Sequence, residues 1–123
     1  MKMTPDRQRR LVLDMLRYAS EIATVVRRGR EELFDRADVR NRVTVEHYLE
    51  LLGEASVAVG QPFRKGNPDV PWGALRRFRF DSAHPYDVAE APVNYEAVWR
   101  FAVNDLPGIA RQLRRAHPPG PGR

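Results

Sequence analysis

Residues 71–86 combine side chains that could bind and cleave a phosphodiester. The stretch reads PWGALRRFRFDSAHPY, and its polar chemistry comes from three arginines, a histidine and a tyrosine: Arg76, Arg77, Arg79, His84 and Tyr86. Arginine holds a phosphate by paired hydrogen bonds, and histidine has the side-chain pKa nearest neutral pH. A helix that delivers both to one place could bind a phosphodiester and move its protons, so ribonuclease chemistry is the leading hypothesis.

Spacing alone does not select this stretch, because arginine is abundant. The chain has 21 basic residues, and only Lys2 and Lys65 are lysines. Each of the three histidines therefore has an arginine five or six residues upstream, in the pairs Arg42 and His47, Arg79 and His84, and Arg111 and His117.

Two of these pairs make poor candidates for a site. Five positions turn a helix by about 140°, so Arg42 and His47 should point apart, and we expect His47 to be structural or merely exposed. His117 falls in a polar tail, where no scaffold can hold a catalytic geometry.

His84 differs because Pro85 disfavours the helical conformation in the residue before it. A helix that ends at His84 frees this side chain to turn back or to reach a partner subunit. The alternative is that the three arginines form a solvated helix face and that His84 is an incidental helix end. The residues alone leave both interpretations open.

Composition predicts a single helical domain over residues 1–116 and a disordered tail, rich in proline and glycine, over residues 117–123. The chain has no cysteine, and its histidines have no metal-ligand spacing, so we expect no metal and no cofactor. No apolar run approaches the ~20 residues that span a bilayer, and no signal segment follows Met1. We therefore expect a cytoplasmic protein with no membrane partner.

The net charge of +5 makes a polyanionic partner plausible, although an arginine-rich composition would produce the same charge without one. The arginines at 76, 77 and 79 alternate with Phe78 and Phe80, which favours nucleic acid. We expect Arg76 and Arg77 to contact RNA.

Helical periodicity predicts an all-α bundle of four main helices and one short helix. Thr4 should cap a first helix that ends at Gly29, a short helix should cover residues 30–36, and Asp38 should cap a third helix that ends before Gly60. Residues 61–71 and 87–93 are predicted as loops on either side of a helix over residues 72–84.

Asn94 should cap the final helix, which Pro107 should kink or restart. Trp72 and Trp99 fall within apolar helical patterns, so we expect both to lie in the core rather than to stack on bases.

Three blocks of the sequence resemble the HepT-like family, the minimal HEPN-domain toxins. Tyr48 to Ala55 reads YLELLGEA and is similar to a helix of that family. Val70-Pro71-Trp72 opens a helix on which the family's R-x4-H-x-Y motif falls at Arg79, His84 and Tyr86. The third block is Val98-Trp99, followed by NDLP at residues 104–107.

This resemblance implies an up-and-down helical bundle that forms a homodimer and cleaves RNA without a metal ion. His84 would act as general base or acid, and Arg79 would hold the phosphate. The implied partner is an MNT-type nucleotidyltransferase antitoxin that neutralises the toxin by transferring AMP to Tyr86.

The sequence departs from the family pattern directly after the motif arginine, where Phe80 replaces a residue that is usually polar. An aromatic ring cannot make the hydrogen bond that an asparagine would make there. The alternative function is therefore a catalytically degenerate HEPN domain that binds RNA or a partner protein. A DNA-binding protein is disfavoured, because no short helix-turn-helix spacing is evident.

Overall fold

The computed structural model describes residues 3–76 and 94–116, and every regular element in these ranges is a helix. The prediction of an all-α bundle is therefore confirmed. The elements are α1 (Pro5–Val26), α2 (Arg30–Leu33), α3 (Arg40–Ala58), α4 (Gln61–Gly66), a helical stretch at residues 72–76, α6 (Tyr95–Arg100), the π-helical η2 (Phe101–Asp105) and α7 (Leu106–Ala116).

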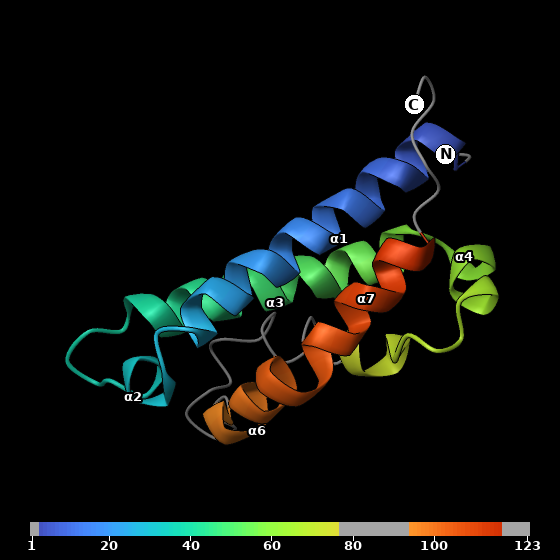
Figure 1. Cartoon of the computed structure of the whole chain (residues 1–123). Coiled ribbons are helices and arrows are strands. Elements are labelled where there is room, and N and C mark those ends of the chain that lie inside the picture. Colours follow the sequence, from blue (N-terminus) through green and yellow to red (C-terminus); the bar gives the residue numbers. More distant parts are fainter. Residues whose placement is uncertain (1–2, 77–93, 117–123) are drawn as a thin grey trace.

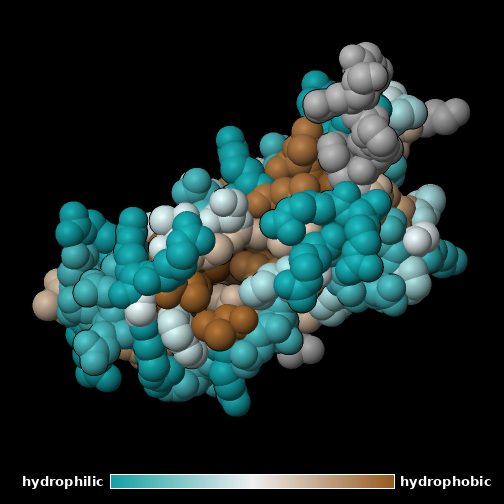
Figure 2. All heavy atoms as spheres, viewed as in Figure 1, coloured by the Kyte–Doolittle hydropathy of each residue, from teal (hydrophilic) through white to brown (hydrophobic). Residues whose placement is uncertain are grey.

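The framework of the bundle consists of the long helices α1 and α3, with α6, η2 and α7 packed along them (Figure 1). The chain reverses direction between α1 and α3, and α7 runs in the same direction as α3, so α1 begins at the end of the bundle where α7 finishes (Figure 1). Leucine, valine, isoleucine and methionine side chains from these helices form one core, in which Met15, Ile22, Leu49, Leu52 and Leu113 are fully buried. Figure 2 shows a mostly hydrophilic surface with a hydrophobic strip between α1 and the α6–α7 helices.

The first helix begins where the sequence predicts. The Thr4 hydroxyl accepts a hydrogen bond from the Arg7 backbone N–H at 3.1 Å, which satisfies one of the free donors at the helix start. Pro5 occupies the first turn, where its missing N–H costs nothing. The helix ends at Val26, and Gly29 follows with a φ of 105°.

The start of α3 differs from the prediction by one residue. Val39 occupies the N-cap position, but the Asp38 carboxylate still accepts the Arg40 backbone N–H at 3.1 Å. The preceding short helix is also shorter than expected, since α2 ends at Leu33.

The prediction of a loop over residues 61–71 is wrong for its first six residues, which form α4. Pro62 lies in the first turn of α4, where proline is well tolerated. Gly60 separates α3 from α4 as predicted. Its φ of 90° and ψ of 156° lie in a region that is essentially restricted to glycine.

Asn94 caps the closing helix, and the regular helix is interrupted before Pro107, as predicted. The Asn94 side chain accepts the Ala97 backbone N–H at 3.1 Å. The Leu106 N–H bonds to the Phe101 carbonyl, five residues earlier, which is the spacing of a π-helical turn. Proline would clash with the carbonyl four residues before it in a regular α-helix, and the wider turn relieves that clash.

Candidate functional site

Of the five predicted site residues, Arg76 is the one that the structure describes. Its side chain is exposed, at the last described position of the helical stretch 72–76. The other four, Arg77, Arg79, His84 and Tyr86, lie outside the described residues, as does Phe80. The described residues therefore show which contacts fix the chain just before and just after residues 77–93.

The helical stretch before this segment is anchored by Trp72. Its indole Nε1 donates a hydrogen bond to the Asn67 carbonyl at 2.9 Å, and its ring meets the Phe63 ring edge-on at 5.9 Å between centroids. Trp72 is 7% exposed, so its prediction as a core residue is confirmed, and Leu75 is also buried. Arg76 thus follows a helical turn that is fixed to α4.

The α4 helix is in turn fixed to the end of α3 by Arg64. Its Nη1 donates to the carbonyls of Ser56 and Val57 at 2.8 and 3.0 Å. These carbonyls belong to the last turn of α3, where they lack partners within the helix. The positive charge of Arg64 also interacts favourably with the negative end of the helix dipole there. Asn67 Nδ2 also donates to the Phe63 carbonyl at 2.9 Å. A series of hydrogen bonds thus connects the end of α3, through α4, to Trp72.

At the other end of the segment, Tyr95 holds the start of α6 against α2 and α3. The Tyr95 hydroxyl donates to the Glu46 carboxylate, its ring lies 5.0 Å from the Arg42 guanidinium carbon, and Phe34 meets it edge-on at 6.5 Å. Burial, and next the bond to Glu46, raise the pKa of Tyr95 to about 12. An ion pair between Arg30 and Glu96 adds a second link between α2 and α6.

This cluster was not predicted from the sequence. Arg42 and Glu46 are four residues apart on one helix, a spacing that places them on the same face, but Tyr95 is about fifty residues further along the chain. Only the fold shows that the three side chains meet.

Arg42 and His47 have different surroundings, as the helical rotation predicts. Arg42 covers the Tyr95 ring, whereas His47 is exposed and lies beside the Tyr48 ring at 5.4 Å. The structure therefore gives no paired site at these two residues. His117 lies outside the described residues.

The other blocks of the resemblance serve the packing of the bundle. In the block at residues 48–55 of α3, Leu49, Leu52 and Ala55 are buried, while Glu54 is exposed. Trp99 is partly buried and packs against the core, as expected. The NDLP block at residues 104–107 contains the end of the π-helical turn.

Residues 3–76 and 94–116 contain no group of three histidine, cysteine or carboxylate side chains that could hold a metal ion. None of the helices in these ranges is long and apolar enough to cross a membrane.

Comparison with known proteins relates the chain to ribonucleases. The profile of the family described as "Ribonuclease HepT-like" matches residues 15–116. A "Putative RNase" of Methanocaldococcus jannaschii is 29% identical over 76 residues, which cover 62% of this chain and 60% of that relative. A "Probable ribonuclease HepT" of Thermococcus cleftensis is 28% identical over 78 residues, 63% of this chain and 67% of that relative. The alignments thus span between three fifths and two thirds of the length of these relatives. No solved structure matches the chain significantly.

Proposed function

Because the chain belongs to the HepT-like ribonuclease family, we propose that it is a metal-independent endoribonuclease and the toxin of a toxin–antitoxin system. The family match over residues 15–116 carries this proposal, since it includes the whole Arg-x4-His-x-Tyr motif. The ribonuclease names of the relatives and the net charge of +5 support it.

The proposed reaction is attack by a ribose 2′-hydroxyl on the adjacent phosphate. His84 removes the proton of the attacking hydroxyl, or protonates the departing 5′ oxygen as the P–O5′ bond breaks. Arg79 holds the phosphate and stabilises the charge that develops on its oxygens. Arg76 and Arg77 contact flanking phosphates, and the exposure of Arg76 is compatible with that role.

We also propose that two chains form a homodimer and that the motifs of both line one basic cleft. A small nucleotidyltransferase of the MNT type would be the antitoxin, and it would transfer AMP to the Tyr86 hydroxyl. A bulky anion two residues from His84 would block the cleft and repel RNA, which explains the neutralisation.

Expression in a bacterium tests the nuclease proposal. Induction of the native chain should arrest growth and degrade RNA, while an equally soluble His84→Ala chain should do neither. If His84→Ala is as toxic as the native chain, His84 has no catalytic role.

The modification has its own test. Incubation with the nucleotidyltransferase and ATP should add adenylyl groups to the native chain but not to Tyr86→Phe, as read by mass spectrometry. Equal modification of both chains would remove Tyr86 as the acceptor.

Phe80 supports a second candidate function, a HEPN domain that binds RNA or a partner without cleaving. The Phe80→Asn substitution distinguishes the two functions. Nuclease activity that appears only in Phe80→Asn favours the binding module, whereas activity in the native chain excludes it.

A further inference from the structure

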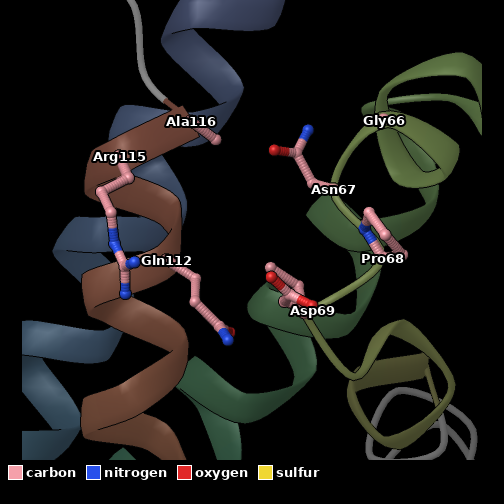
Figure 3. A pocket seen from close by; sticks show the side chains of 8 residues that line it. Gly66, Asn67, Pro68, Asp69, Gln112, Arg115 and Ala116 are labelled. Carbon is pink, nitrogen blue, oxygen red and sulfur yellow. The ribbon is translucent and has the colours of Figure 1, made fainter.

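A polar groove lies beside the helical stretch that leads to the motif. It runs between residues 66–70 and the last turns of α7, and its volume is about 240 Å³ (Figure 3). The side chains of Gln112 and Arg115 extend from α7 on one wall, and those of Asn67 and Asp69 extend from the opposite wall.

The α7 wall offers hydrogen-bond donors and positive charge. Arg115 is exposed, and among the described residues no carboxylate pairs with its guanidinium. The α7 helix itself carries three arginines and no acidic residue. A negatively charged group is therefore attracted to this wall.

The opposite wall offers hydrogen-bond acceptors. Asp69 is an exposed carboxylate, and Asn67 uses its Nδ2 to donate to the Phe63 carbonyl, which leaves its Oδ1 available to accept. A simple anion would be attracted to Arg115 but repelled by Asp69. The groove instead suits a ligand with an anionic group on one side and hydrogen-bond donors on the other.

A ribonucleotide unit has this arrangement, since it joins an anionic phosphate to a sugar hydroxyl and a base with amino groups. The groove is smaller than the ~300–1,000 Å³ pockets that enclose whole small ligands, which suits one unit of a chain. In the sequence, the Asn67–Val70 wall is followed two residues later by Trp72 and then by exposed Arg76. RNA that lies in the groove can therefore extend towards Arg76, which directly precedes the motif segment in the sequence.

We propose that this groove binds one nucleotide of the RNA substrate, with a phosphate on Arg115 and the hydrogen-bond donors of the sugar or base on Asp69. The identification of RNA as the occupant rests on the proposed ribonuclease function. The groove would then be a substrate-binding site in addition to the motif.

Arg114 provides a matched control on the same helix. It has the same charge as Arg115 and is also exposed, but it lies about 100° further round the helix and does not line the groove. The substitutions Arg115→Gln and Arg114→Gln therefore change the net charge equally and differ in position alone.

The experiment measures the affinity of a short single-stranded RNA by fluorescence anisotropy over a range of salt concentrations. All chains carry His84→Ala, so that the RNA stays intact. We expect Arg115→Gln to weaken binding roughly tenfold and to reduce the slope of log K against log salt by about 0.7, the loss of one phosphate contact. Arg114→Gln should change the affinity by less than about twofold, because it lies outside the groove. Equal losses in the two variants would overturn the proposal.

Asp69→Ala tests whether a nucleotide or only an anion occupies the groove. If a nucleotide occupies the groove, the substitution removes its hydrogen bond to Asp69, so RNA binding should weaken. If the groove holds only an anion on Arg115, the substitution removes the repulsion between that anion and Asp69. Tighter RNA binding by Asp69→Ala would therefore contradict the proposal.

Cleavage assays on chains that retain His84 separate this inference from the proposed function. If the native chain cleaves RNA but Arg115→Gln and Arg114→Gln bind RNA alike, the groove proposal fails and the nuclease stands. If no cleavage occurs but Arg115→Gln alone weakens binding, the groove stands and the nuclease proposal fails.

Discussion

Single side chains outside the motif fix the helices that precede and follow residues 77–93. Arg64 is the clearest case, because its guanidinium bonds to two carbonyls at the end of α3 from a position within α4. Lysine could supply the charge at this place, but it lacks the planar, multi-donor geometry of the guanidinium.

Replacement of Arg64 by alanine should lower the free energy of unfolding by about 1–2 kcal/mol, near the low end for bonds to a charged group, because the bond to the Val57 carbonyl is exposed to solvent. Urea denaturation measures the change. Lys65→Ala is the control, because Lys65 is exposed on the same helix, and its effect should stay within about 0.5 kcal/mol. Equal effects of the two substitutions would show that Arg64 does not link α3 to α4.

The raised pKa of Tyr95 should make the stability of the chain depend on pH in the alkaline range. Its pKa is raised from 10.0 to about 12 in the folded chain, so between these values the folded state keeps a proton that the unfolded state has lost. The free energy of unfolding should therefore fall as the pH rises through this window. Tyr95→Phe should be less stable by about 1 kcal/mol at neutral pH because the bond to Glu46 is lost.

The measurement is the difference in stability between the native chain and Tyr95→Phe from pH 8 to pH 12. We expect this difference to be constant up to about pH 10 and then to shrink. A difference that stays constant up to pH 12 would mean that the pKa of Tyr95 is not raised.

At the scale of the elements, two glycines with opposite backbone requirements make a matched test. Gly60 has a φ of 90° and a ψ of 156° between α3 and α4, so Gly60→Ala should cost about 1–3 kcal/mol. Gly73 is helical, and an added Cβ would meet nothing within 4 Å, so Gly73→Ala should stabilise the chain by about 0.5 kcal/mol. Thermal unfolding of the two variants should shift in opposite directions, and a shared sign would contradict this account of the α3–α4 junction.

The helices could be predicted where local signals agree with the packing. Thr4, Gly60 and Asn94 each start or end a helix where their side-chain or backbone chemistry predicts, because caps depend on residues only a few positions away. The α4 helix was missed because Pro62 is compatible both with a loop and with a first helical turn. A six-residue helix is too short for its hydrophobic periodicity to distinguish it from a loop.

At the scale of the whole molecule, the fold explains why the site could be predicted only in part. The motif residues are local in sequence, so their identity and order can be recognised without a structure. The supports of the segment are not local, since Tyr95 meets Glu46 and Arg30 meets Glu96 across more than forty residues. Such contacts depend on how α2, α3 and α6 pack, which no short sequence pattern encodes.

The homodimer is a prediction at the same scale. The purified chain should elute in size-exclusion chromatography with light scattering at twice the mass of one chain, at concentrations used for cleavage. The rate of RNA cleavage per chain should also fall on dilution, because a cleft built from two motifs is lost when the dimer dissociates. A monomer that cleaves RNA at full rate would contradict a shared cleft.

Cleavage by purified protein tests the central claim most directly. A labelled single-stranded RNA is incubated with the native chain or with His84→Ala, each in excess EDTA, and the products are resolved by length and by their ends. The account predicts that the native chain cuts the RNA despite the chelator and leaves 2′,3′-cyclic phosphate ends, and that folded His84→Ala leaves it intact. Intact RNA with the native chain, or equal cleavage by His84→Ala, would contradict the account.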